Sequence, residues 1–299
     1  MARRDRPTVH GVAVVDKPAG WTSHDVVAKS RGLLGTRKVG HSGTLDPDAT
    51  GVLVLGVGAA TRLLTYLSGL PKEYTGEVVL GTATSTLDAS GEVTGEWDMA
   101  ATTLDQVRAA AATLTGDIEQ VPPMVSAKKV DGQRLHALAR QGIEVERAPV
   151  PVRVERFDVG DAVAPGVYPV TVACSSGTYV RSLAADLGTA LGGGAHLRNL
   201  RRLSVGAYGL DEAVPLDELS PERLLAPAEA LRGRPSVVAD GEVLAAVRHG
   251  RVLPATTLGV VGEGPWGVVD PEGSLVAVYH AHRGNDVKPG LVLAIDRPG

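Results

Sequence analysis

A glycine-rich segment that carries one aspartate followed by a proline constrains this chain most strongly. It runs from Gly40 to Gly51 and reads GHSGTLDPDATG. Glycines let the backbone turn tightly and approach a ligand closely, and Pro47 biases Asp46 towards an extended conformation. A continuous apolar run, Val52 to Leu55, follows directly. We therefore expect a loop that presents the Asp46 carboxylate at the end of a buried strand.

The same residues have a simpler interpretation, because an isolated Asp-Pro in a glycine-rich stretch is usually only a turn. Asp48 is a nearby rival to Asp46. It lies two residues further on, would point the opposite way in an extended loop, and is interpreted as a solvated turn residue. A functional interpretation of Asp46 therefore depends on the other segments of the chain.

Length and composition indicate a globular protein with an aliphatic core. The chain has 299 residues, of which 43% are hydrophobic, 21% charged and only 3% aromatic, which leaves room for one large domain and a small one. Cys174 is the only cysteine, so an intrachain disulfide is excluded and a reducing, cytoplasmic location is expected. The N-terminal residues lead into no apolar signal core. The longest uncharged apolar stretch, about Ala49 to Thr61, is too short to span a bilayer, so we predict no membrane segment.

The charge balance is a weak guide to the partner. A formal net charge of −4 argues weakly against nucleic acid, but the distribution of charge counts for more than its sum. Acidic residues concentrate in 92–98 and 211–222, away from the basic ones, so a basic face is compatible with the sequence. The alternative is that each basic group is a solvated surface. The three basic groups are Arg31, Arg37 and Lys38; Lys128, Lys129 and Arg134; and Arg198, Arg201 and Arg202.

The order of predicted elements indicates an α+β fold around a mixed or antiparallel sheet, because strands and helices alternate without a strict βαβ rhythm. Two helices begin with capping-box patterns, at Thr22 with Asp25 and at Thr102 with Asp105. The predicted strands are 11–15, 52–55, 73–80, 150–157, 168–174 and 201–206, and the predicted helices are 22–34, 59–67, 102–114, 133–141 and 179–187, the last ending at Gly188.

The sequence pattern changes at about Ser236. From there, short apolar runs alternate with glycine and proline turns, as at Asp270-Pro271-Glu272-Gly273. We therefore expect one domain over residues 1–235 and a small β-rich module over residues 236–299.

Two glycine patterns look like nucleotide-binding loops but depart from them at the deciding position. In residues 35–42, His41 stands where a phosphate-binding loop needs lysine. In residues 56–61, Thr61 replaces the third glycine of a dinucleotide-binding loop. Neither segment predicts a nucleotide site.

The Asp46 segment resembles the signature G-H-x-G-x-L-D-P-x-A-x-G of the TruB-type tRNA pseudouridine synthases, and it meets every fixed position. Further segments resemble motifs of the same family and keep their order, over roughly the first 210 residues. These segments are DKPAGWTS from Asp16, KEY from Lys72, PPMVSAKK from Pro122, CSSGTYVRSL from Cys174 and HLRNLRRL from His196.

The resemblance implies both a fold and an activity. The fold is a pseudouridine-synthase-like mixed or antiparallel sheet with flanking helices, and residues 236–299 are similar to a PUA-like RNA-binding module. A β-rich module without RNA contact is the alternative. The implied activity is isomerisation of uridine-55 in the T-loop of tRNA to pseudouridine, with the tRNA T-stem-loop as partner and neither a metal nor an organic cofactor. We expect a monomer.

Catalysis is assigned by the resemblance to Asp46 and Arg181. A carboxylate must act as nucleophile or as base, and both options stay open here. A guanidinium beside Asp46 would hold it ionised and lower its pKa. Tyr74 and Tyr179 are candidate contacts of the target base, and Leu200 is a candidate apolar wall of the pocket.

RNA contacts are expected from one histidine and six cations. A uridine in a structured loop must leave its stack to react, and His41 is expected to contact RNA there without shuttling protons. The alternative is a turn histidine satisfied by the backbone. Cations that neutralise phosphates make binding weaken with salt. The six are Lys17, Arg37, Lys38, Lys128, Arg201 and Arg202.

Two other classes of function stay open. One is an RNA-binding or tRNA-folding protein that uses the same surface without turnover, against which the retained Asp46 and Arg181 argue. The other is an aspartate-dependent hydrolase of a small glycoside or phosphate. Glycosidases usually need a second placed carboxylate, and no motif here supplies one.

Overall fold

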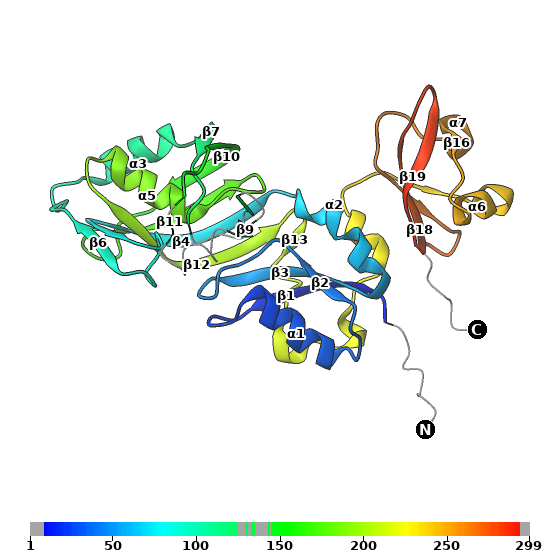
Figure 1. The fold of residues 1–299 in the computed structure, drawn as a ribbon, viewed down its shortest axis with the longest axis horizontal. Coiled ribbons are helices and arrows are strands. Elements are labelled where there is room, and N and C mark those ends of the chain that lie inside the picture. The colour runs from blue at the N-terminus through cyan, green and yellow to red at the C-terminus, as the bar shows by residue number, and fades with distance from the viewer. Residues whose placement is uncertain (1–8, 125–128, 131–132, 135–142, 144, 294–299) are drawn as a thin grey trace.

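The computed structural model describes residues 9–124, 129–130, 133–134, 143 and 145–293. In this part of the chain, a ten-stranded sheet forms the body of the protein (Figure 1). Its strands are β1 (Gly11–Lys17), β2 (Val39–Ser42), β3 (Thr50–Val57), β4 (Lys72–Leu80), β7 (Gly116–Gln120), β10 (Val150–Val159), β11 (Val167–Cys174), β12 (Ala195–Val205), β13 (Tyr208–Gly209) and β14 (Val214–Pro215).

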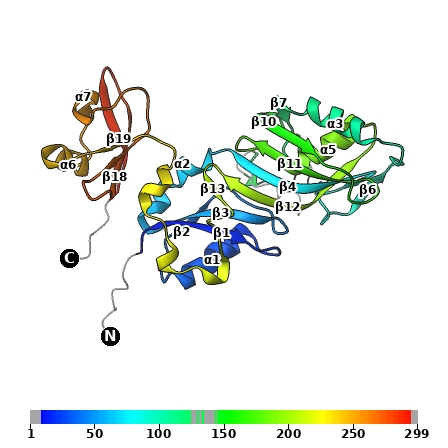
Figure 2. The same ribbon diagram turned by 180° about the vertical axis from the view of Figure 1, so that it is seen from behind.

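The sheet is mixed. Its order is β14-β1-β3-β12-β4-β11-β10-β7, with β2 paired to β3 and β13 to β12. Strand β12 runs parallel to β3 and antiparallel to β4, and β14 runs parallel to β1. The predicted α+β fold around a mixed or antiparallel sheet is confirmed. Strand β12 joins the two halves of the sheet, which lie side by side in both views (Figures 1 and 2).

Helices cover the sheet, and their caps follow from local sequence. Thr22 and Asp25 form the predicted capping box, since each side chain accepts a hydrogen bond from the other's N–H. The second capping box uses Thr103 and Gln106, one residue after the predicted pair, because glutamine serves the motif as well as an acid. The helices of the body are α1 (Ser23–Leu33), α2 (Leu64–Ser68), α3 (Leu104–Thr113) and α5 (Val180–Ala190), with the 3₁₀ turns η1 (Gly58–Leu63), η2 (Leu216–Glu218), η3 (Pro221–Arg223) and η4 (Pro227–Leu231).

Three predicted boundaries are wrong. Helix α5 continues past Gly188, because this glycine allows close approach: a Cβ there would lie 2.4 Å from the N atom of Ala195. Strand β12 begins at Ala195, well before the predicted Arg201. Within the predicted helix 133–141, Gln133–Arg134 form strand β9 against β8 (Lys129–Val130), and residues 135–141 lie outside the described residues.

Each half of the sheet has its own aliphatic core. Helices α3 and α5 pack on β4, β10 and β11, where Val78, Val172 and Leu183 are fully buried. On the other half, α1 packs on β1 and β3 through Val26 and Leu53. The hairpin of β5 (Thr82–Thr84) and β6 (Val93–Glu96) extends beyond the first half.

A second, five-stranded sheet begins at Ser236 and lies beside α2 (Figures 1 and 2). Leu291 of this sheet and Leu293, just after its last strand, share a core with Leu63 and Leu67 of the body. The side chains across the seam are also bonded, as in the 2.9 Å contact of Tyr66 Oη with His280 Nε2. The elements are β15 (Ser236–Val238), α6 (Gly241–Arg248), β16 (Leu253–Pro254), α7 (Ala255–Leu258), β17 (Trp266–Val269), β18 (Leu275–Ala281) and β19 (Asp286–Val292).

Gly51 lies directly against Arg202 where β3 pairs with β12. Its φ is +101°, and a Cβ there would lie 2.1 Å from the carbonyl oxygen of Arg202. Gly20 is a matched control, since its φ is +78° but a Cβ there meets nothing within 4 Å. We predict that Gly51→Ala lowers the free energy of unfolding by about 3 kcal/mol or more, and Gly20→Ala by about 1 kcal/mol. Urea denaturation measures both, and equal losses would contradict the prediction.

Candidate active site

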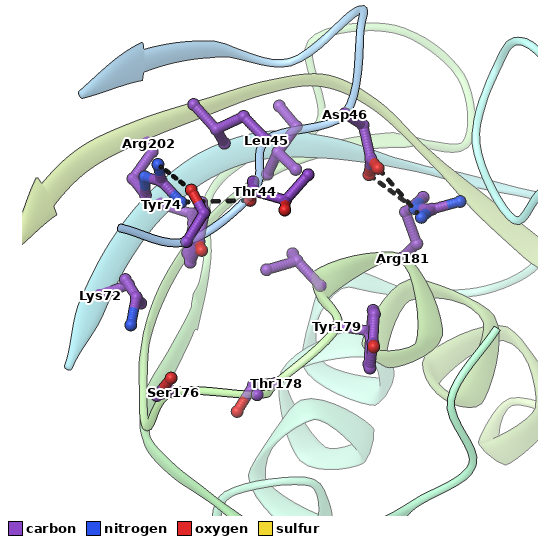
Figure 3. A pocket seen from close by; sticks show the side chains of 14 residues that line it. Thr44, Leu45, Asp46, Lys72, Tyr74, Ser176, Thr178, Tyr179, Arg181 and Arg202 are labelled. Carbon is purple, nitrogen blue, oxygen red and sulfur yellow. Dashed lines mark hydrogen bonds and ion pairs between the residues drawn. The ribbon is translucent and has the colours of Figure 1, made fainter. Parts of the chain in front are cut away.

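A cavity of about 260 Å³ opens where the β2–β3 loop, β4, β12 and the start of α5 meet (Figure 3). It gathers six of the predicted site residues: Asp46, Tyr74, Tyr179, Arg181, Leu200 and Arg202. The other lining residues are Gly43, Thr44, Leu45, Lys72, Ser176, Gly177, Thr178 and Val180.

Asp46 and Arg181 form a bidentate ion pair at this cavity. The Nε atom of Arg181 lies 2.9 Å from Oδ2 of Asp46, and its Nη2 donates to Oδ1 at 3.2 Å. The side chain of Arg181 is only 5% exposed, whereas that of Asp46 is 38% exposed and opens onto the cavity (Figure 3). A planar guanidinium that binds both oxygens fixes the orientation of the carboxylate as well as its position.

A second carboxylate, that of Asp88, shares the same guanidinium. It lies 3.4 Å from Nη1 of Arg181, and the same nitrogen donates to the carbonyl of Thr86 at 2.9 Å. The hydroxyls of Thr86 and Ser90 donate to Asp88 at 2.5 and 2.6 Å. Sequence reasoning missed Asp88, because it lies in a turn between β5 and β6 that matched no motif. Arg181 is therefore held from two sides.

Burial shifts the pKa of Asp46. Desolvation raises the pKa of this carboxyl above its usual value, the Arg181 guanidinium opposes that shift, and Asp88 adds to it. Lys17 also lowers the pKa and Asp48 raises it. The expected influence of Arg181 on the pKa of Asp46 is thus confirmed in its direction, since the guanidinium lowers that pKa. The net shift is nevertheless upward, because the loss of water outweighs the attraction.

Arg202 is a buried residue and not a surface cation. It is 1% exposed, and its guanidinium donates to the carbonyls of Val52 at 2.7 Å, Gly43 at 3.2 Å and Thr44 at 3.4 Å. The contact of Arg202 with an RNA phosphate stays a prediction, and these backbone contacts argue against it. The residue instead holds the loop that leads to Asp46.

Lys17 has the same kind of role. It is fully buried, and its ammonium donates to the carbonyls of Pro18, Trp21 and Pro47 at 2.9, 2.6 and 2.9 Å. Desolvation lowers the pKa of Lys17 to about 8, and the nearby Asp46 opposes the shift. An ammonium has three N–H donors, and all three are used here. The phosphate contact of Lys17 stays a prediction, and these three hydrogen bonds argue against it.

Leu200 reaches the cavity because β12 is irregular. The pairing of β12 with β4 shifts register between Arg198 and Arg201, and Asn199 has a positive φ of 54°. Glu77 of β4 accepts hydrogen bonds from Arg198 at 2.6 Å and from Asn199 at 3.1 Å. An extra residue in a strand redirects the neighbouring side chains, and here it turns Leu200 towards the cavity.

Two residues at the start of β4 line the cavity. Tyr74 is 8% exposed, and desolvation raises the pKa of its phenol, so the ring stays neutral. Lys72 is 6% exposed and donates to the carbonyls of Ser68 and Leu70 at 2.9 and 2.7 Å. Burial lowers the pKa of Lys72 to about 8. Lys72 belongs to the K-x-Y motif, yet sequence reasoning did not assign it to the site.

His41 lies on β2 and does not line the cavity. Its ring meets that of His24 edge-on, with the centroids 5.4 Å apart. Desolvation and the nearby His24 lower the pKa of His41, so the ring is neutral near pH 7. Its contact with RNA stays a prediction.

The remaining predicted cations have different surroundings. Arg37 and Lys38 are exposed just before β2, whereas Arg201 forms a two-pronged pair with Asp16 at 2.7 and 3.1 Å. Lys128 lies outside the described residues. Contact of these cations with RNA phosphates stays a prediction.

The glycine loop at residues 56–61 has no room for a phosphate. The N–H of Ala59 donates to Nδ1 of His10 at 2.9 Å, and a Cβ on Gly58 would lie 2.2 Å from that nitrogen. Among the described residues, no group of three or more His, Cys, Asp or Glu could hold a metal ion. Within the same residues, no helix is long and apolar enough to cross a membrane.

Solved structures share this fold. A structure of a Cbf5-Nop10-Gar1 complex superposes with a TM-score of 0.72 at 25% identity, covering 99% of this chain and 90% of the other. A structure of an H/ACA RNP bound to a substrate RNA containing 2'-deoxyuridine gives a TM-score of 0.71 at 22% identity, covering 98% and 92%. The fold, including both sheets, is therefore a recurring architecture.

Sequence comparison assigns the class and then the family. Residues 31–180 match the N-terminal domain of TruB family pseudouridylate synthases, and residues 181–232 match the C-terminal domain of tRNA pseudouridylate synthase B. The protein is thus a pseudouridylate synthase by class. The tRNA pseudouridine synthase B of Arthrobacter sp. (strain FB24) is 49% identical, over 95% of this chain and 96% of the relative, and that of Streptomyces coelicolor is 48% identical over 93% and 95%. The chain belongs to the TruB family.

The contrast between buried and exposed cations can be tested. We predict that Lys17→Met lowers the free energy of unfolding by about 2–4 kcal/mol, because three buried carbonyls lose a charged donor. The tRNA affinity of its folded fraction should stay within about twofold, since a buried ammonium contributes no phosphate contact. Lys38→Met is the matched control. It should leave the free energy of unfolding unchanged in urea denaturation and weaken tRNA binding in filter binding. Weakened tRNA binding by folded Lys17→Met would contradict this assignment.

Proposed function

We propose that this protein isomerises uridine-55 in the T-loop of tRNA to pseudouridine, with Asp46 as the catalytic carboxylate acting on a flipped-out uridine. The observation that carries the proposal is the Asp46–Arg181 ion pair at the wall of a cavity of about 260 Å³. Relatives at 48–49% identity that are named tRNA pseudouridine synthase B support tRNA as the substrate.

The chemistry needs one carboxylate and no redox partner. The N1–C1′ bond of the uridine breaks and a C5–C1′ bond forms, while C5 loses its hydrogen as a proton and N1 gains a proton. The carboxylate serves as nucleophile or as base, and both roles require ionised Asp46. Arg181 supports that state, since it opposes the desolvation that raises the pKa of Asp46.

The walls of the cavity suit a single base. Ligand pockets usually measure about 300–1,000 Å³, so a cavity of about 260 Å³ fits a small flat group better than a stretch of RNA. A uridine enters such a cavity only after it leaves its stack. We assign contacts with the base to Tyr74, Tyr179 and Leu200, since an aromatic face and an apolar wall can hold a pyrimidine between them.

The proposal also covers the assembly and the setting of the enzyme. It acts as a monomer in the cytoplasm without metal or organic cofactor. Residues 1–235 form its catalytic domain, and residues 236–299 form a PUA-like module that binds RNA. On the catalytic domain, Arg37, Lys38 and Arg201 remain the proposed phosphate contacts.

A cluster of cations at the seam supports RNA binding by the C-terminal module. Arg62 and Arg234 of the body and Lys288 of β19 have no carboxylate within ion-pair distance among the described residues. Arg62 donates to the carbonyl of Val292 and Arg234 to that of Tyr66. Lys288 pairs with His280, whose ring stacks on that of Tyr66. Burial and then the charges of Arg234 and Lys288 lower the pKa of His280. Cations without counter-ions on a protein of net charge −4 form a favourable surface for a polyanion.

We expect Lys288→Ala to weaken tRNA binding and to reduce the slope of log Kd against log salt by about one. Lys29→Ala is the control, because Lys29 already pairs with Asp217 at 3.6 Å and should not change the slope. Filter binding at several salt concentrations measures both variants. An unchanged slope for Lys288→Ala would remove this residue from the RNA surface.

The activity itself is tested by tritium release from C5-labelled uridine in an unmodified tRNA transcript. We expect release by the wild type and a loss of at least about 10⁴-fold for Asp46→Asn, with tRNA affinity changed by only a few fold. Release by both proteins would remove Asp46 from catalysis. Binding without any release would favour the RNA-binding or tRNA-folding alternative.

The stability of Asp46→Asn has a predictable sign. A carboxyl whose pKa is raised in the folded state binds more protons when folded, so stability falls as the pH rises through that pKa. At pH 7.5 the Asp46 carboxylate is ionised and the wild type has lost this stability. The Asp46→Asn variant carries an uncharged amide and has not. The melting temperature of Asp46→Asn should therefore equal or exceed that of the wild type, and the difference should shrink as the pH falls towards the carboxyl range. A lower melting temperature at pH 7.5 would contradict this.

A further inference from the structure

Gln120 makes an unusual pair of contacts close to the site. It is the last residue of β7 and is 1% exposed. Its Oε1 atom accepts the N–H of Tyr179 at 2.7 Å, and its Nε2 donates to the carbonyl of the same residue at 3.0 Å. One side-chain amide thus satisfies both main-chain groups of a residue 59 positions away in sequence. The side-chain amide of Gln120 thus bonds to the main chain of Tyr179 as the main chain of a neighbouring β-strand would.

The residue that Gln120 holds is the N-cap of α5. Tyr179 has an extended backbone, φ −102° and ψ 106°, and no side-chain cap. Its own side chain lines the cavity, and its carbonyl accepts the N–H of Leu183. Next to this contact, the Ser182 hydroxyl donates to the carbonyl of Val121 at 3.2 Å. Three hydrogen bonds therefore join Gln120 and Val121, at the end of β7, to the start of α5.

That first turn carries Arg181, two residues after Tyr179. The guanidinium of Arg181 meets Asp46 at 2.9 Å and Asp88 at 3.4 Å. Its placement therefore depends on where the main chain enters the helix, and Gln120 holds that entry point. A displacement of about 1 Å in an active site can slow a reaction about 100-fold. No motif of the sequence assigns Gln120 a role.

We propose that Gln120 is a positioning residue of the isomerase, which holds the main chain at Tyr179 and thereby sets Arg181 against Asp46. This inference rests on the proposed function, because it acts on the same carboxylate. Gln120 touches no reacting atom in this scheme and works only through the helix entry. A purely structural glutamine would affect the amount of folded protein and nothing else.

The acid limb of the rate profile separates these two roles. The charged groups that face Asp46 are Arg181 from α5, Asp88 from the β5–β6 turn, Lys17 from β1 and Asp48 from its own loop. Of these, Arg181 exerts the largest influence that favours the ionised carboxylate. Moving the guanidinium away raises the pKa of Asp46 further, so the acid limb of the single-turnover rate should move to higher pH.

The experiment compares wild type with Gln120→Met, which keeps the side-chain length but loses both hydrogen bonds. Single-turnover tritium release from C5-labelled tRNA is measured across pH, together with tRNA binding and thermal melting of each protein. We expect a rate about 10- to 100-fold lower, an acid limb at higher pH, and a Kd for tRNA within about threefold. If Gln120→Met does not fold, Gln120→Asn takes its place. Its amide is one methylene too short to reach both groups, and the same two shifts are expected.

Ser30→Ala is the matched control. The Ser30 side chain is fully buried, and its hydroxyl donates to the carbonyl of Val26 at 2.7 Å within α1, away from the cavity. Its loss should lower the melting temperature and leave the rate per folded enzyme and the acid limb unchanged. The same shift of the limb in Ser30→Ala would overturn the role of Gln120.

The remaining outcomes are also decisive. A Gln120 variant with the rate and acid limb of an active wild type overturns the positioning role and leaves the proposed function intact. An inactive wild type overturns both the proposed function and the positioning role, because there is then no isomerisation that Gln120 could support. A slower Gln120 variant with a displaced acid limb supports the proposal.

Discussion

The ion pair between Asp46 and Arg181 is the interaction on which the rest of the site depends. The two residues come from a glycine-rich loop and from the first turn of a helix, far apart in sequence. Their pairing balances opposing effects, because desolvation raises the pKa of Asp46 while the guanidinium favours its charged form. Asp88 holds the other edge of the guanidinium. Much of the surrounding structure keeps these groups in place.

Buried cations supply part of that support. Lys17 and Arg202 direct their donors at backbone carbonyls of the loops around Asp46. A charged donor bonded to carbonyls in a buried site is costly to remove, so it makes a firm anchor for a loop with little regular structure. The same contacts occupy donors that a phosphate would need. The proposed RNA surface therefore relies on exposed residues such as Arg37, Lys38 and Lys288.

The large sheet provides the frame for both sides of the pair. Strand β12 joins its halves, and the register shift beside Asn199 turns Leu200 towards the cavity. Local signals predicted much of this frame, because apolar alternation and capping boxes act over a few residues. They failed where another segment decides. Gly188 looked like a helix stop, yet it serves the close approach of Ala195.

The sequence by itself determined the class of the fold and many of its strands and helices. Through its resemblance to a family, it also determined the residues Asp46, Tyr74, Tyr179, Arg181 and Leu200, which the structure gathers at one cavity. It could not separate buried from exposed cations, because a lysine in a motif has the same sequence signal whether it is buried or exposed. Nor could it reveal Asp88 or Gln120, whose partners are remote in sequence. Only the tertiary structure decided these points, because burial and hydrogen bonding are set by the segments that pack around a residue.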